Sequence, residues 1–218
     1  MQNNITCTSF DRIFHSCGRL WHIRRADMDK LWEAMGNNDE DQPPYWNEVW
    51  PSSLALAGWL AERQNDITGK ACLDMGCGLG FTALAGQWLG ASVTAMDYEP
   101  AAIEYAKLNE KLNTVSGVRW EVMDWRRPAL RPKSFERVWA GDIMYEKEFA
   151  APIVRFLETV LAPEGRVWIA EPGRKVFSAF LETARKGFDI EKLCSLPVSP
   201  LTHQKIPVPV TLWELRRC

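Results

Sequence analysis

The sequence has few of the residues that metal centres and disulfide frameworks require. Its 218 residues include three histidines and six cysteines, and no two cysteines form a Cys-x-x-Cys pair. Structural zinc sites use cysteine and histidine at short, regular spacings, and a chain of this length does not need disulfides to stabilise its core. We therefore expect a reduced protein with no metal site and no disulfide framework.

Long apolar runs and an excess of charge are also absent. The longest apolar candidate, residues 54–61, is far shorter than the roughly 20 residues of a membrane span. The start, Met1-Gln2-Asn3-Asn4, lacks the basic region followed by an apolar region of a signal peptide. A formal net charge of -2 gives no electrostatic reason to expect nucleic acid as a partner. These absences predict a cytoplasmic protein that binds neither membrane nor nucleic acid.

Strand and helix patterns alternate through most of the chain. The expected strands are 70–75, 91–97, 118–124, 135–143 and 166–171, and the expected helices between and after them are 81–89, 100–112, 149–161 and 176–186. Such alternation predicts an α/β fold with a parallel sheet covered on both faces. Two further strands, 188–196 and 208–215, have no helix between them, which predicts an antiparallel pair at the end.

The chain before the alternating part predicts a helical N-terminal extension that packs on the main domain. Apolar residues recur at helical spacing over 26–35, and residues 37–44 are polar and end in two prolines, as in a loop. Ser52 or Ser53 is the expected N-cap of a helix that continues to about Arg63. We therefore divide the chain into an N-terminal extension, 1–43, and a main domain, 44–218.

A glycine-rich turn follows the first strand of the alternating part. It reads Leu73-Asp74-Met75-Gly76-Cys77-Gly78-Leu79-Gly80 and opens a helix. Glycine permits positive φ and close approach of a ligand to the backbone, and the helix start supplies unpaired N–H groups. Gly76, Gly78 and Gly80 are therefore candidate ligand contacts, although a tight turn without a ligand explains the same spacing.

Two common nucleotide sites do not fit this turn. A dinucleotide site needs a third glycine where Phe81 stands, and a phosphate-binding loop needs a Lys-Ser/Thr pair that is missing. The carboxylate of Asp74 would repel a pyrophosphate but could accept a hydrogen bond from an amino group.

Acidic residues stand at the ends of the next two strands. Asp97, with Tyr98 beside it, is placed to bind two ribose hydroxyls. Asp124 could accept from an adenine amino group while the indole of Trp125 covers the ring. Exposed strand-end acids are the alternative explanation for both. Together these features describe an adenosine joined to an amino acid without a phosphate receptor, which fits S-adenosylmethionine as the cofactor.

The Asp-x-Gly-x-Gly-x-Gly turn with the later acid Asp97 resembles the class I, seven-strand methyltransferases. This resemblance implies a Rossmann-like, doubly wound seven-stranded sheet in the order 3-2-1-4-5-7-6, with the last strand antiparallel. The antiparallel pair expected at the end of the chain agrees with that order.

Two other segments narrow the resemblance from about Tyr45 onward. Pro44-Tyr45-Trp46-Asn47-Glu48-Val49-Trp50-Pro51-Ser52 and Gly141-Asp142-Ile143-Met144-Tyr145-Glu146 are similar to segments of the family 16 protein lysine methyltransferases, and most similar to the group that modifies the electron-transfer-flavoprotein β-subunit. The resemblance implies a protein substrate that presents a lysine, with an electron-transfer flavoprotein or a ribosomal protein as candidates. Some names in that branch suggest nicotinamide methylation instead.

The same residues have a physical interpretation. Methyl transfer requires a neutral amine, whereas a free lysine has a pKa near 10.4. Asp142 could hold the amine, and Tyr145 could orient it or close the pocket. Trp46 and Trp50 could lie against the sulfonium or the methylated ammonium, a contact worth roughly 0.5–2 kcal/mol. A helix N-cap is the alternative for Asp142, and core packing is the alternative for each tryptophan.

Three hypotheses for function follow. The first is a protein lysine methyltransferase, and the second is a methyltransferase for a nicotinamide-like amine or another metabolite. The third is a cofactor-binding module without catalysis, or a nicotinamide-dependent oxidoreductase. Phe81 argues against the oxidoreductase, and the intact Asp142-x-x-Tyr145 motif argues against an inactive module. The sequence leaves the acceptor, the number of methyl groups added and the oligomeric state open.

Overall fold

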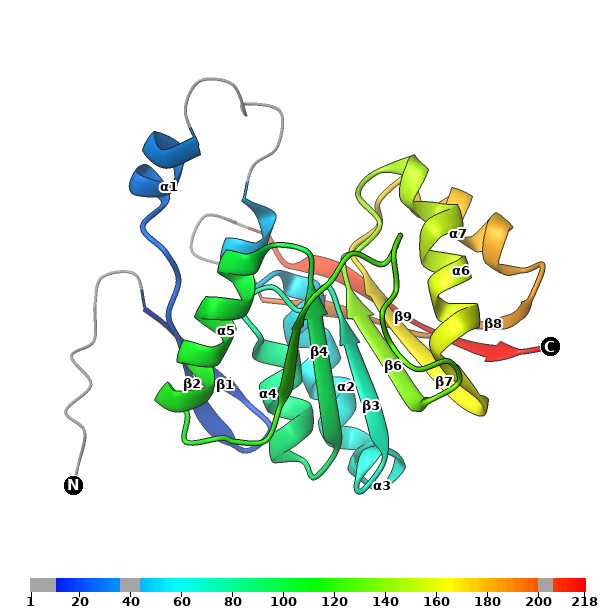
Figure 1. Cartoon of the computed structure of the whole chain (residues 1–218), viewed down its shortest axis with the longest axis horizontal. Helices are drawn as coiled ribbons and strands as arrows, with labels where there is room; N and C mark the ends of the chain where they lie inside the picture. The colour runs from blue at the N-terminus through cyan, green and yellow to red at the C-terminus, as the bar shows by residue number, and fades with distance from the viewer. Residues whose placement is uncertain (1–10, 36–43, 200–205) are drawn as a thin grey trace.

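The computed structural model describes residues 11–35, 44–199 and 206–218. Its centre is a seven-stranded sheet in the order β5-β4-β3-β6-β7-β9-β8 (Figure 1). The strands are β3 (Ala71–Met75), β4 (Ser92–Asp97), β5 (Arg119–Val122), β6 (Phe135–Gly141), β7 (Leu161–Glu171), β8 (Phe188–Val198) and β9 (Val208–Arg217). β9 is antiparallel to β7 and β8, and the other neighbours pair in parallel. The predicted order with one antiparallel strand is confirmed.

Helices cover both faces of the sheet. The helices are α2 (Pro51–Glu62), α3 (Gln64–Ile67), α4 (Phe81–Trp88), α5 (Pro100–Leu112), α6 (Ala150–Val160) and α7 (Phe177–Ala184), with short 3-10 turns η1 (Tyr45–Asn47) and η2 (Lys147–Phe149). Trp168 of β7 packs in a core with α2, α4 and α5, whereas its neighbours Val167 and Ile169 pack in a second core with α6 and α7. This alternation along a strand is what burial on both faces requires.

The start of α2 differs from the prediction. Pro51 is the first helical residue, and Trp50 precedes it without a side-chain cap. The expectation that Ser52 or Ser53 caps the helix is therefore wrong, because both serines already lie in the first turn. Proline is well suited to that first position, since its missing N–H would have no partner there.

The N-terminal part contains a β-hairpin as well as the predicted helix. β1 (Arg12–Ser16) and β2 (Arg19–Ile23) pair antiparallel, and α1 (Met28–Met35) follows. Cys17 and Gly18 both have positive φ, of 51° and 72°, as in a two-residue type I′ turn. Figure 1 shows the hairpin beside α4 and α5. Residues 36–43, most of the expected loop 37–44, lie outside the described residues.

Asparagine side chains attach β2 and the residue after it to the domain. Asn109 of α5 accepts from the backbone N–H of Arg24 at 2.7 Å and donates to the carbonyl oxygens of Arg24 at 3.1 Å and Leu79 at 3.0 Å. Asn113, one turn later, accepts from the N–H of His22 at 2.9 Å and donates to its carbonyl oxygen at 2.8 Å. The N-terminal segment is thus tied to α5 and, through Leu79, to the glycine turn.

No helix within residues 11–35, 44–199 and 206–218 is both long enough and apolar enough to cross a bilayer.

Candidate functional site

A cleft of about 340 Å³ lies where the parallel strands β3, β4 and β6 end. This edge of an open α/β sheet is where ligands usually bind, and the volume lies in the range of small-molecule sites. The predicted site residues that line the cleft are Trp46, Trp50, Gly76, Gly78, Asp97, Tyr98, Trp125, Asp142 and Tyr145. Segments that are far apart in the sequence thus meet at one site.

The charged residues in the wall of the cleft are all acidic. They are Glu48, Asp97, Glu99 and Asp142, and the described lining includes no lysine, arginine or histidine. A phosphate-bearing ligand normally needs cationic side chains or a phosphate-binding loop. The acidic and aromatic wall instead suits a ligand that carries positive charge.

The three glycines of the turn have different surroundings. Gly76 (φ +70°) and Gly78 (φ +49°) line the cleft, and a Cβ on Gly78 would lie 3.1 Å from the carbonyl oxygen of Trp46. Gly80 (φ +84°) precedes the first residue of α4 and is not among the lining residues. A Cβ there would lie 2.8 Å from Cη2 of Trp120 and 2.9 Å from Cβ of Ala106. Gly80 therefore serves the packing of α5 and β5.

Asp97 holds the glycine turn in place. Its Oδ2 accepts from the N–H of Gly78 at 2.8 Å, and its Oδ1 accepts from the N–H of Glu99 at 3.1 Å. Burial raises the pKa of this carboxyl, and these backbone hydrogen bonds oppose the rise. Each oxygen keeps a second lone pair, so the carboxylate can still accept from a ligand. Tyr98 is exposed at the rim, and partial burial raises its pKa to about 12.

Like Gly80, the two predicted cofactor contacts Asp74 and Asp124 are not part of the cleft lining. Asp74 is buried and accepts from the hydroxyl of Thr82 at 2.6 Å, and burial raises its pKa to about 7. Asp124 pairs with Arg126, whose Nη2 lies 2.7 Å from Oδ2, and this side chain lowers the pKa of Asp124. Contacts of Asp74 and Asp124 with a cofactor stay predictions.

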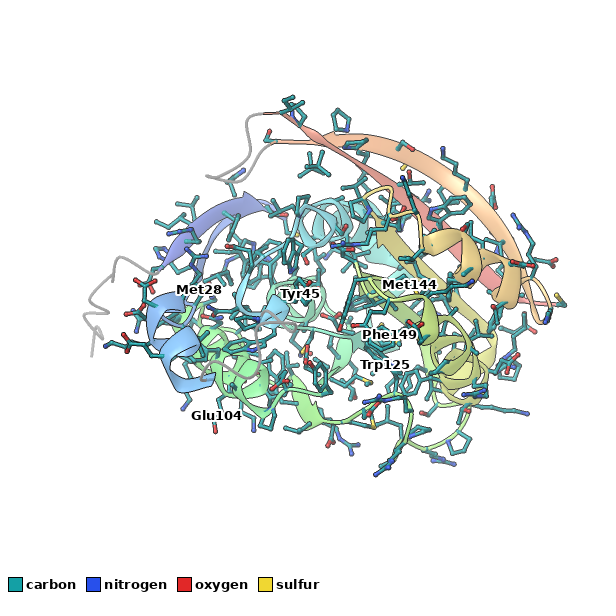
Figure 2. The ribbon with its side chains drawn as sticks, turned by 90° about the horizontal axis from the view of Figure 1, so that it is seen from above. Met28, Tyr45, Glu104, Trp125, Met144 and Phe149 are labelled. Atoms are coloured by element: carbon teal, nitrogen blue, oxygen red, sulfur yellow. The ribbon has the colours of Figure 1, made fainter. Side chains whose placement is uncertain are left out.

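Aromatic rings form one wall of the cleft. Tyr45 lies 5.2 Å from Tyr145, and Tyr145 lies 5.1 Å from Phe149, measured between ring centroids. Trp125 packs edge-on against Phe149 at 5.4 Å; Figure 2 shows these two rings side by side, with Tyr45 nearer the centre of the view. The indole of Trp50 donates to the carbonyl oxygen of Tyr45 at 2.8 Å. Tyr45 was not among the predicted site residues, although it lies in the segment that carried the resemblance.

Asp142 is held by a residue that sequence reasoning missed. It follows β6 with φ +55°, and its carboxylate receives hydrogen bonds from Nε and Nη2 of Arg174, the second at 2.8 Å. Burial raises the pKa of Asp142, and Arg174 opposes that rise. The N-cap alternative does not describe this side chain, since the next helical turn, η2, follows Glu146 without a side-chain cap. Arg174 lies 32 residues from Asp142, so no local pattern links them.

Comparison with known proteins shows the family to which this chain belongs. A family model described as "Lysine methyltransferase" matches residues 34–186. The electron transfer flavoprotein beta subunit lysine methyltransferases of Rattus norvegicus and Homo sapiens are 34% and 30% identical, each over 68% of this chain. A TehB-like SAM-dependent methyltransferase from Corynebacterium glutamicum has a similar fold, with a TM-score of 0.57 at 20% identity over 88% of this chain and 98% of that one.

The chain spans only part of the relatives it matches. The match covers 58% of the Rattus norvegicus protein and 57% of the Homo sapiens protein.

Proposed function

Because this chain belongs to the lysine methyltransferase family, we propose that it transfers a methyl group from S-adenosylmethionine to a lysine side chain of a protein. The observation that carries the proposal is the cleft itself, whose described lining is acidic and aromatic and has no cationic side chain. S-adenosylmethionine bears a sulfonium, an ammonium and a carboxylate group but no phosphate, so its net positive charge complements this wall.

The glycine turn and Asp97 are suited to hold the adenosine part. Gly76 and Gly78 line the cleft without side chains, so a ligand can approach their backbone closely. Asp97 can accept hydrogen bonds from ribose hydroxyls. Trp125 and Tyr98 line the same end and can cover the adenine ring. Asp74, beneath the turn, is in addition a candidate partner for the amino group of the methionine part.

Asp142 and Tyr145 are the candidate catalytic residues at the acceptor end. When bound, the cofactor would supply a methyl group on its sulfonium sulfur. A neutral amine would take this methyl group by in-line displacement as the C–S bond breaks and a neutral thioether leaves, so the enzyme would act mainly by positioning. Asp142 would accept a hydrogen bond from the amine, and Tyr145 would limit its orientation. Trp46, Trp50 and Tyr45 would exclude water and stabilise positive charge near the transferred methyl group.

A protein acceptor is supported by the family and by the names of the relatives. The proteins at 30–34% identity are named for methylating a lysine of the electron transfer flavoprotein beta subunit. We therefore take that subunit as the first candidate acceptor and a ribosomal protein as the second.

The cofactor assignment can be tested by titration calorimetry of the full chain with S-adenosylmethionine and with NAD. We expect binding of S-adenosylmethionine and none of NAD, because the residues described around the cleft include no cationic side chain to receive the pyrophosphate. Binding of NAD alone would refute the proposed cofactor.

The acceptor class can be tested with tritiated methyl groups. The protein is incubated with labelled S-adenosylmethionine and a cell extract, and the mixture is then precipitated with acid. We expect label in the precipitated protein, and amino-acid analysis should find it on methylated lysine. Label confined to the soluble fraction would instead establish a small-molecule acceptor, such as a nicotinamide-like amine.

The role of Asp142 can be tested by Asp142→Ala. Loss of the hydrogen-bond acceptor should abolish transfer, while the affinity for S-adenosylmethionine measured by calorimetry stays nearly unchanged. A large loss of cofactor affinity would contradict the assignment of Asp142 to the acceptor end. Arg119→Gln is a suitable control, because it breaks an ion pair with Glu121 on the exposed start of β5.

A further inference from the structure

Arg174 fixes the carboxylate of Asp142 from outside the cleft. Asp142 lines the cleft and its side chain is 5% exposed, whereas Arg174 is 35% exposed and is not among the lining residues. The two N–H groups of the guanidinium meet the two carboxylate oxygens, a bidentate arrangement that sets the plane of the carboxylate. The contact therefore orients Asp142 without filling the space in front of it.

The backbone around this ion pair is also constrained. A positive φ at a residue other than glycine is uncommon and persists only where the surrounding structure holds it. The N–H of Asp142 donates to the carbonyl oxygen of Ala170 at 2.9 Å. The backbone N–H of Arg174 donates to the buried carboxylate of Glu171 at the end of β7. The loop after β7 is thus folded so that Arg174 reaches the residue after β6.

We infer that Arg174 is a positioning residue, which keeps Asp142 ionised and oriented as the hydrogen-bond acceptor for a neutral acceptor amine. The inference rests on the proposed function. Arginine stays protonated throughout the working pH range, and each oxygen of Asp142 retains a lone pair after the guanidinium has bound. The ion pair of Asp142 and Arg174 has no net charge, so it stabilises an ammonium ion less than a lone carboxylate would. This difference favours the neutral amine, which is the form that reacts.

The charges around Asp142 determine the expected effect of removing Arg174. Arg174 and Glu171 are the charged side chains that face it, and Tyr45 lies near Arg174. Without Arg174, burial and the negative charge of Glu171 would both raise the pKa of Asp142 further. A larger share of Asp142 would then be protonated at neutral pH and could not accept from the amine. The acidic limb of the pH–rate profile should therefore move to higher pH.

The test compares Arg174→Gln and Arg174→Lys with the wild-type chain. Methyl transfer from tritiated S-adenosylmethionine into a protein extract freed of small molecules is measured from pH 6 to pH 10. We expect Arg174→Gln to lose roughly 10- to 100-fold in rate relative to the wild type at pH 7. The ratio of the two rates should recover at higher pH, whereas deprotonation of the substrate lysine raises both rates alike. Arg174→Lys keeps the positive charge, so the acidic limb should stay near its wild-type position. Its maximal rate should be reduced, because lysine lacks the planar guanidinium that donates to both carboxylate oxygens.

Each alternative outcome has a definite meaning. Equal loss at every pH for Arg174→Gln, or a weakened affinity for S-adenosylmethionine, would show a merely structural role and overturn the inference. A wild-type rate for Arg174→Lys would overturn the need for a bidentate contact, and this variant decides the matter if Arg174→Gln fails to fold. Arg119→Gln should behave as the wild type. If the wild-type chain labels no protein at any pH, the proposed function itself fails, a result distinct from an unshifted profile in an active variant.

Discussion

At the scale of single residues, glycines with positive φ are not equivalent. Gly80 has positive φ and packed neighbours within 3 Å of its missing Cβ, whereas Gly69 has positive φ (+72°) and open space. We expect Gly69→Ala to cost about 1–2 kcal/mol of stability from backbone strain alone. Gly80→Ala should cost about 1–3 kcal/mol more, because Trp120 and Ala106 must move. Urea unfolding of both variants measures the difference; equal costs would contradict the packing role of Gly80.

Asp74 should make stability depend on pH. Its pKa is raised by burial from 3.8 to about 7, so the folded state binds a proton more readily than the unfolded chain does. The stabilising contribution is therefore complete below about pH 4 and is lost as the pH rises through about 7. Relative to Asp74→Asn, the wild-type chain should lose unfolding free energy between pH 5 and pH 8.

The matched control for this prediction is Asp124→Asn. Arg126 lowers the pKa of Asp124. The stability that this ion pair contributes is therefore lost only as the pH falls from the ordinary pKa of an aspartate through the lowered pKa of Asp124. Urea unfolding should show no differential change for Asp124→Asn between pH 5 and pH 8. A wild-type chain that gains stability over this interval relative to Asp74→Asn would contradict the raised pKa.

At the scale of elements, the asparagines of α5 connect the hairpin to the domain. Asn109 is fully buried, and its side chain makes three hydrogen bonds to backbone groups of Arg24 and Leu79. Asn109→Ala should cost about 1–3 kcal/mol, because buried backbone groups lose their partners. Urea unfolding measures this cost, and amide hydrogen exchange should accelerate at Arg24. Lys107→Ala, at an exposed position of the same helix, should change neither quantity. Comparable effects in both variants would contradict the role of Asn109 in attaching the N-terminal segment.

The predicted elements show what local pattern can resolve. The alternating strands and helices from Ala71 to Ala184 were found because each buries an apolar face of characteristic period. The hairpin β1–β2 was missed, because its polar and apolar residues are mixed and its stability comes from Phe81 and the asparagines of α5, which lie far along the chain. The cap of α2 was misplaced because proline, and not a serine, begins that helix.

At the scale of the whole molecule, cofactor binding should stabilise the fold. A ligand that binds only the folded state at 100 times its Kd adds about 2.7 kcal/mol to the free energy of unfolding. The cleft joins the ends of several strands with η1, so S-adenosylmethionine should raise the unfolding midpoint of the whole domain in one transition. Asp97→Asn should reduce the shift at the same cofactor concentration. A midpoint that S-adenosylmethionine leaves unchanged in the wild-type chain would contradict the proposed cofactor site.

The sequence by itself determined the alternation of strands and helices, the glycine turn and about half of the residues that line the cleft. Its resemblance to the class I methyltransferases implied the order of the strands in the sheet. The alternation and the turn depend on short-range spacing, and the expectation that strand-end residues meet rests on the rule that parallel strands end at one edge. Only the tertiary structure decided which of the predicted site residues line the cleft. Asp74 is hydrogen-bonded to Thr82, and Asp124 is paired with Arg126. Gly80 packs against Trp120. The tertiary structure also supplied Tyr45 as a ring partner of Tyr145 and Arg174 as the partner of Asp142. Such pairs depend on side-chain direction and on contacts across long stretches of chain, which no local spacing records.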